Sequence, residues 1–161
     1  MRTVIGVMGA GKALDEAAHA VAYHLGAMIA ARGWVLLTGG GARGVMDAAS
    51  RGAHEAGGLV VGVLKGDTPA EASRHLDIAI RTGMGDARNV INVLSSDVVI
   101  ALPGDSGTLS EMALGLKSGK PVIALGWDPG SAMRASGPGR LLDAPTAEEA
   151  VALASRLVDT V

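Results

Sequence analysis

The stretch Thr38-Gly39-Gly40-Gly41-Ala42-Arg43-Gly44-Val45-Met46-Asp47 joins a short apolar run, residues 35–38, to a segment with helical periodicity, residues 45–56. A simple two-residue turn would not need three consecutive glycines, which are costly to order. A helix beginning near Val45 would aim its free N–H groups and positive dipole end at an anionic ligand. We therefore interpret the stretch as a strand-to-helix connection at a phosphate site, the alternative being a tight turn without a ligand.

The rest of the chain repeats this alternation of short apolar runs with segments of helical periodicity. Apolar runs rich in Val, Ile and Leu lie at 3–7, 60–64, 98–102 and 122–125. Helical patterns lie at 14–28, 45–56 and 85–95, and further ones begin at 108 and 146. Strands are continuously apolar when helices cover both faces of a parallel sheet. The sequence predicts an α/β fold: a single Rossmann-like domain (1–161), doubly wound, with a mainly parallel sheet and helices on both faces.

Two polar, Gly- and Pro-containing stretches, 65–75 and 127–143, are predicted to be loops. A structureless loop as long as 127–143 is uncommon in a compact domain and is often a lid or binding loop. The longer stretch is therefore a candidate lid.

Composition excludes several classes of function. The 161 residues include no Cys, so disulfides, thiolate metal sites and cysteine nucleophiles are excluded. Aromatic residues are 2% of the chain and the net charge is −2, which argues against nucleic-acid partners. No apolar stretch reaches 18 residues and no signal peptide precedes the first predicted strand, so we expect no membrane partner and a cytoplasmic protein.

Ligands of doubly wound folds bind outside the carboxyl ends of the strands, so the segments after each strand are examined for a site. The segment 6–13, Gly-Val-Met-Gly-Ala-Gly-Lys-Ala, differs from a P-loop by Ala13, which lacks the hydroxyl that would bind Mg²⁺. It is either a tight glycine turn or a loop whose N–H groups and Lys12 face an anion. No metal site is expected, because the four His are scattered.

A second Gly-rich helix start is Pro103-Gly104-Asp105-Ser106-Gly107-Thr108-Leu109-Ser110-Glu111. The Thr-x-x-Glu spacing predicts a capping box, with Thr108 as N-cap and Glu111 reaching back. Alternatively, Glu111 is a carboxylate that acts on a sugar beside a phosphate site. Arg88 either faces the same cleft or is a surface residue paired with Asp86.

These segments supply the candidate residues. The candidate ligand- or phosphate-binding residues are Gly9, Lys12, Gly39, Gly40, Gly41, Gly44, Gly104, Asp105, Ser106, Gly107 and Thr108. The candidate catalytic residues are Arg88 and Glu111.

The two Gly-rich segments are similar to the G-G-G-x-x-G-[LV]-M and P-G-G-x-G-T-x-x-E motifs of the LOG-type superfamily, often labelled "possible lysine decarboxylase". Arg88 matches an Arg that lies between these motifs. The resemblance extends from Val4 to about Leu125, and it implies a Rossmann-like fold and a helix-mediated homodimer or homotetramer. True lysine decarboxylase activity is not expected, because no Lys lies in a recognisable pyridoxal context.

Within the superfamily, the resemblance implies two activities. The short chain and Thr82-Gly-Met-Gly-Asp-Ala-Arg-Asn89 look more like the molybdenum-cofactor carrier proteins, which implies binding of a phosphorylated small molecule, with that cofactor as the carried ligand. The alternative is a nucleoside 5′-monophosphate phosphoribohydrolase. This resemblance implies that Arg88 and Glu111 act at the ribose without a cofactor, and that the phosphate is held by Gly104, Ser106, Gly107 and Thr108. A third reading is a structural or regulatory oligomer with a vestigial pocket.

One residue departs from the superfamily motif. Asp105 replaces the second glycine of the P-G-G segment. A carboxylate about 4 Å from a phosphate costs roughly 1–4 kcal/mol per charge pair. Either Asp105 turns away, or the bound group is not a simple nucleotide phosphate and presents hydrogen-bond donors, as a pterin or ribose does.

Overall fold

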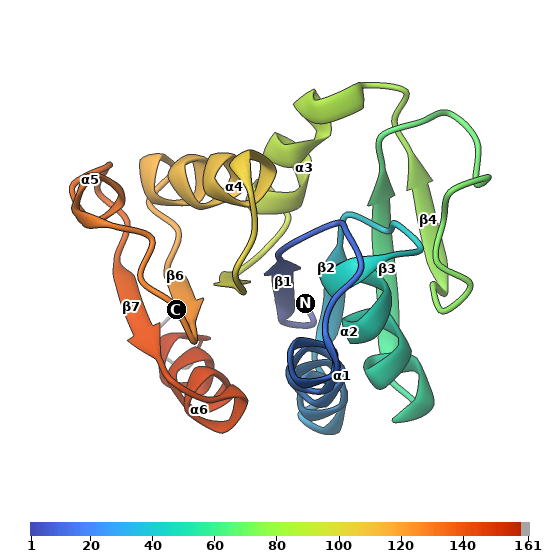
Figure 1. Ribbon diagram of the computed structural model, residues 1–161, viewed down its shortest axis with the longest axis horizontal. Coiled ribbons are helices and arrows are strands. Elements are labelled where there is room, and N and C mark those ends of the chain that lie inside the picture. Colours follow the sequence, from blue (N-terminus) through green and yellow to red (C-terminus); the bar gives the residue numbers. More distant parts are fainter. Residues whose placement is uncertain (159–161) are drawn as a thin grey trace.

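The computed structural model describes residues 1–158, which form a seven-stranded sheet between two layers of helices (Figure 1). The strand order is β4-β3-β2-β1-β5-β6-β7, and every pairing of neighbouring strands is parallel. The strands are β1 (Val4–Met8), β2 (Val35–Thr38), β3 (Leu59–Leu64), β4 (Ile78–Arg81), β5 (Val98–Ala101), β6 (Val122–Leu125) and β7 (Leu141–Ala144). The predicted doubly wound α/β fold is confirmed.

Helices cover both faces of the sheet. They are α1 (Glu16–Ala31), α2 (Gly44–Glu55), α3 (Asn89–Leu94), α4 (Ser106–Lys117), α5 (Ser131–Arg134) and α6 (Ala147–Val158), with a 3₁₀ helix η1 (Gly85–Arg88) before α3. Helices α1, α2 and α6 lie on one face, and α3 and α4 lie on the other (Figure 1). Because both faces of the central strands are covered, their sequences are continuously apolar.

Two apolar clusters hold these layers to the sheet. Side chains alternate between the faces of a strand. In β1, Ile5 and Val7 point toward α1, α2 and α6, whereas Met8 belongs to the cluster beneath α4. The buried face of α2 presents Ala48, Ala49 and Ala53. Small side chains of this kind let α2 pack closely on its neighbours, as its sequence indicated.

Both edge strands differ from the prediction. The short helix α5 lies inside the stretch 127–143, which was predicted to be a loop, and β7 begins inside it. β4 lies in a region to which no element was assigned, and all four of its residues are exposed. Edge strands have one neighbour and incomplete cover, so their apolar signal is short and mixed with charge. The stretch 65–75 contains no helix or strand, as expected.

The remaining differences concern helix boundaries. The predicted helix 85–95 is divided into η1 and α3, and the helix predicted to begin at Thr108 begins at Ser106. Before α6, Thr146 and Glu149 have the Thr-x-x-Glu spacing of a capping box, and the Glu149 N–H donates to Thr146 Oγ1 at 3.3 Å, which is half of such a box. Among residues 1–158, no helix has both the length and the apolar character that crossing a bilayer requires.

Candidate functional site

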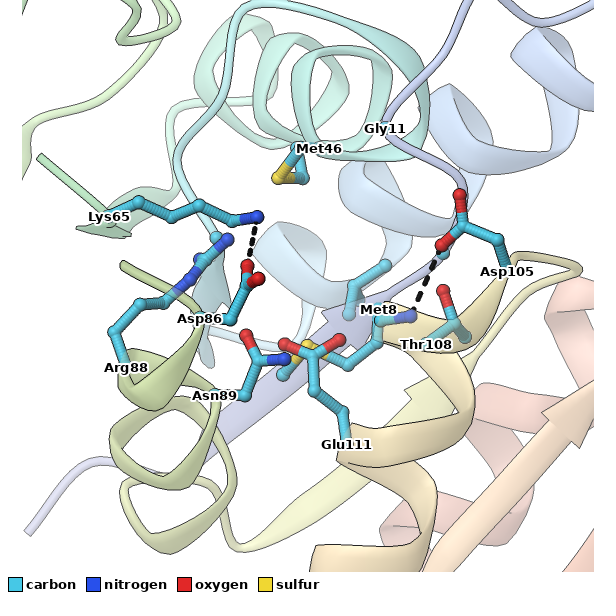
Figure 2. A pocket seen from close by; sticks show the side chains of 14 residues that line it. Met8, Gly11, Met46, Lys65, Asp86, Arg88, Asn89, Asp105, Thr108 and Glu111 are labelled. Carbon is cyan, nitrogen blue, oxygen red and sulfur yellow. Dashed lines mark hydrogen bonds and ion pairs between the residues drawn. The ribbon is translucent and has the colours of Figure 1, made fainter. Parts of the chain in front are cut away.

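A cleft lies at the carboxyl ends of the strands, where the strand order reverses between β1 and β5. This is the position at which doubly wound sheets bind ligands. The cleft has a volume of about 180 Å³. Its walls come from the segments that follow β1, β2, β3 and β5, together with η1 and the first turns of α3 and α4 (Figure 2). The lining residues are Val7, Met8, Gly9, Gly11, Gly39, Met46, Lys65, Asp86, Arg88, Asn89, Asp105, Gly107, Thr108 and Glu111.

The Gly-rich turn after β2 makes room for other parts of the chain. A Cβ on Gly39 would overlap Nη1 of Arg88. Gly44 has φ +63°, and a Cβ there would overlap the backbone oxygen of Ala10, which accepts a hydrogen bond from Val45 N at 2.9 Å. Of the glycines in this turn, only Gly39 lines the cleft. The glycines therefore seat Arg88 and join the turns after β1 and β2.

Arg88 is buried at the base of the cleft, with 5% of its surface exposed. Its Nη1 donates to the backbone oxygen of Val63 at 2.7 Å, whereas its Nε is buried and has no hydrogen-bond partner in the described chain. Burial lowers the pKa of the guanidinium, while the charges of Glu111 and Asp86 oppose that change. The structure favours the first of the two alternatives for Arg88, since the side chain is buried at the cleft and Asp86 forms its ion pair with Lys65 (Figure 2).

Glu111 is also buried, with 7% of its surface exposed. Its Oε1 accepts a hydrogen bond from Asn92 Nδ2 at 2.8 Å, so the capping box predicted with Thr108 is not present. Burial raises the pKa of Glu111, and the Asn92 hydrogen bond and the charge of Arg88 partly offset this effect. Arg88 and Glu111 form no ion pair within residues 1–158, and both line the cleft. A ligand between them would meet a cation and a carboxyl group.

Asp105, not Thr108, is the N-cap of α4. Its Oδ1 accepts the Gly107 N–H at 3.2 Å, so an acidic side chain already occupies part of the helix start. Thr108 is 2% exposed, and its Oγ1 is buried without a hydrogen-bond partner in the described chain. A Cβ on Gly104 would overlap this hydroxyl. The turn therefore places an unpaired hydroxyl and a carboxylate on the same side of the cleft (Figure 2).

The structure brings together only part of the candidate set. Gly9, Gly39, Arg88, Asp105, Gly107, Thr108 and Glu111 line the cleft, whereas Lys12, Gly40, Gly41, Gly44, Gly104 and Ser106 do not. Lys12 is exposed. The cleft lysine is instead Lys65, which follows β3 directly, so the search for residues after each strand would have identified it. Asn89 on α3 donates to Ser110 Oγ on α4 at 3.0 Å. No group of three or more His, Asp or Glu that could hold a metal occurs in residues 1–158.

Three features define an α/β protein of the LOG type: the reversal of strand order, the Gly-rich helix starts, and the buried Arg88 and Glu111. Residues 2–151 match the SLOG cluster4 family, and the chain belongs to that family.

Relatives of known structure extend this assignment. The chain is 45% identical to the molybdenum cofactor binding protein of Rippkaea orientalis, over 98% of both chains, with a TM-score of 0.93. It is 42% identical to the Moco carrier protein of Chlamydomonas reinhardtii over the full length of both, with a TM-score of 0.91. It is 40% identical to a cytokinin riboside 5′-monophosphate phosphoribohydrolase of Mycobacterium tuberculosis over 57% of this chain. That match spans half the length of the mycobacterial protein.

Proposed function

We propose that this protein binds the molybdenum cofactor, a phosphorylated pterin, as cargo in the cleft between β1 and β5. Two proteins that match it along almost their whole length, those of R. orientalis and C. reinhardtii, are described as binding or carrying that cofactor. The match to the phosphoribohydrolase of M. tuberculosis covers little more than half of the chain. The cleft itself supplies further arguments.

The observation that carries the proposal is the presence of unpaired polar atoms in buried side chains of the cleft. Arg88 Nε and Thr108 Oγ1 line or adjoin the cavity and have no partner in the described chain. A buried donor without an acceptor costs about 1–3 kcal/mol, so such groups are retained where a ligand satisfies them. Arg88 and Lys65 add positive charge for an anionic group.

Asp105 disfavours a phosphate at the start of α4 and suits a group that presents hydrogen-bond donors there, as a pterin ring does. A carboxylate accepts hydrogen bonds, and the amino and ring N–H groups of a pterin donate them, whereas phosphate oxygens do not. A phosphate placed at the start of α4 would meet the Asp105 carboxylate and a Gly107 N–H that is already bonded. In this arrangement the ring lies near Asp105, and the phosphate lies toward Arg88 and Lys65.

The second candidate is hydrolysis of a nucleoside 5′-monophosphate to a free base and ribose 5-phosphate. Its support is that Arg88 and Glu111 both line the cleft. Cleavage of an N-glycosidic bond develops oxocarbenium charge, which an anionic carboxylate stabilises. However, burial raises the pKa of Glu111, which disfavours the anion that this step needs. The burial of Glu111 therefore favours binding over hydrolysis.

The first experiment measures the cargo directly. The chain is expressed in a bacterium that makes the cofactor and purified without oxygen. Molybdenum is quantified by mass spectrometry and pterin by fluorescence after oxidation. We expect both to copurify in comparable amounts, and we expect Thr108→Val and Lys65→Ala to lower both at least several-fold. Lys12→Ala is the matched control, because Lys12 is an exposed lysine outside the cleft.

A parallel assay measures the release of ribose 5-phosphate from nucleoside 5′-monophosphates, with Glu111→Gln as its control. Turnover that disappears in the variant, from a protein that contains no pterin, would overturn the carrier proposal in favour of hydrolysis. A protein that contains neither pterin nor molybdenum and has no turnover would overturn both.

A further inference from the structure

Asn89, the first residue of α3, lies in the wall of the cleft and follows Arg88 directly in the chain. It is a polar side chain in a buried position, with 7% of its surface exposed. Its Nδ2 donates to Ser110 Oγ on α4 at 3.0 Å, so one half of the amide joins the two helices that flank the cleft. The other half of the amide is therefore the part to explain.

The hydrogen bonds of Ser110 fix the orientation of the Asn89 amide. The Ser110 hydroxyl donates its single proton to the backbone oxygen of Gly107 at 2.7 Å, so toward Asn89 its oxygen can only accept. A rotated amide would bring two acceptor oxygens together. Asn89 therefore presents Nδ2 to Ser110, and its Oδ1 points into the cleft (Figure 2). This oxygen has no hydrogen-bond partner within residues 1–158.

The cleft thus offers hydrogen-bond acceptors on two of its walls. Asn89 Oδ1 comes from α3, and the Asp105 carboxylate comes from the start of α4 (Figure 2). The cations Arg88 and Lys65 suit the phosphate of a ligand, but a phosphate oxygen without a proton has nothing to donate to either acceptor. The two acceptors therefore fit a part of the ligand that carries N–H or O–H groups.

We propose that Asn89 determines the specificity of the cleft by accepting a hydrogen bond from a ring N–H or amino group of the pterin. A pterin is flat and carries donors on more than one edge, so one edge faces Asn89 while another faces Asp105. The inference rests on the proposed function. It adds a residue that recognises the ring, whereas Arg88 and Lys65 recognise the phosphate.

A neutral amide suits this position because it accepts a hydrogen bond without adding charge beside Arg88. A carboxylate at position 89 would also accept, and the Ser110 hydroxyl can turn to donate to it, but its charge would oppose a phosphate nearby. An apolar side chain of similar size would leave the donor of the ligand without an acceptor. Asn89→Asp and Asn89→Leu therefore separate the role of the oxygen from the role of charge.

Two small ligands test the ring and the phosphate separately. Hydroxymethylpterin has the ring without a phosphate, and its fluorescence reports binding. Ribose 5-phosphate has the phosphate and hydroxyl donors without the ring, and calorimetry reports its binding. Asn89→Leu should weaken pterin binding about ten-fold and change ribose 5-phosphate binding by less than about two-fold. Asn89→Asp should keep pterin binding within about three-fold of the parent and weaken ribose 5-phosphate binding, as Lys65→Ala should also do.

The same variants are compared for the pterin that copurifies with them, which Asn89→Leu should lower at least several-fold. Circular dichroism melting checks that each variant is folded, and Lys12→Ala is the control outside the cleft. Equal pterin binding and equal copurified pterin in the parent and Asn89→Leu would overturn the inference and leave the proposed function standing. Equal losses of both ligands in Asn89→Leu would show a structural role or recognition of a sugar hydroxyl, and would also overturn it. A parent that neither binds nor copurifies with a pterin would overturn both.

Discussion

Two Gly-rich turns in this protein have similar sequences and different roles. The turn 39–44 after β2 and the turn 104–108 after β5 both lead from a buried strand into a helix of twelve residues. In the first turn, Gly39 and Gly44 leave space for Arg88 and for the backbone of Ala10. In the second turn, the helix start lies at the cleft, where Asp105 and Thr108 present oxygen atoms to it.

The comparison shows that a run of glycines does not identify a ligand contact. Apart from Gly39, which lines the cleft, the first turn supports the site by fitting tightly against other parts of the protein. The second turn forms the site and leaves a buried hydroxyl unpaired. Substitutions in the first turn should therefore act on stability, and those in the second should act on binding.

The largest effect is expected at Gly44. Gly44→Ala forces an unfavourable positive φ and an overlap with the Ala10 backbone, so we expect a loss of about 3 kcal/mol or more in the free energy of unfolding. Gly57→Ala is the matched control at the other end of α2. Gly57 also has a positive φ, +76°, but its Cβ would meet nothing within 4 Å, so about 1 kcal/mol is expected. Equal losses in urea denaturation would contradict the close-packing role.

The next effect is the coupling between Gly39 and Arg88. Gly39→Ala should cost about 2–3 kcal/mol, because the added methyl overlaps the guanidinium, whose alternative positions break the bond to Val63. In an Arg88→Ala background, the same substitution should cost less by at least 1 kcal/mol. A double-mutant cycle measured by denaturation gives this difference. Additive losses would show that Gly39 does not serve to seat Arg88.

A smaller effect concerns the dependence of stability on pH. Burial raises the pKa of Glu111 above the value it has in the unfolded chain. Its contribution to stability is therefore fully present below the ordinary glutamate pKa and is lost as pH rises through the folded-state pKa. Each unit of upward shift corresponds to about 1.4 kcal/mol. Urea denaturation between pH 4 and 8 should show this loss in the parent protein and a flatter profile in Glu111→Gln. Parallel profiles would contradict the assignment.

The smallest effect is expected at Asp105. Asp105→Ala should lower stability by about 1 kcal/mol through loss of the N-cap. It should also strengthen binding of inorganic phosphate several-fold, because a nearby negative charge is removed and the Gly107 N–H becomes free. Asp15→Ala is the control: Asp15 caps α1 by accepting from Ala18 N at 2.7 Å, so its loss should change stability alone. Calorimetric titration with phosphate gives both affinities. Unchanged binding in Asp105→Ala would show that Asp105 is not what keeps phosphate from the start of α4.

The sequence predicts the central part of this fold well, because its signal comes from burial. The strands at 35–38 and 122–125 agree with the prediction at both ends. β4 and β7 were not predicted, because an edge strand has only one neighbour and is incompletely buried. In β4, all four residues, Ile78–Arg81, are exposed. Local residue patterns cannot show whether a distant part of the chain covers a strand.

The position of the site could be predicted, because it follows from where the strands end. The hydrogen bonds within it were harder to predict, because several side chains compete for the same partner. Arg88 and Glu111 were placed correctly at the cleft, but the Thr108–Glu111 spacing indicated a capping box that does not form. Asn92 on another helix bonds Glu111 instead, and Asp105 caps α4. Lys65 was missed as a cleft residue, because it lies at the start of a stretch interpreted only as a loop.

The end of β3 has a consequence for the two cations of the cleft. Nη1 of Arg88 donates to the backbone oxygen of Val63, and Lys65 follows the strand directly. Both cations are therefore attached to the same strand end, although they lie far apart in the sequence. A displacement of that strand end would move the two positive charges together.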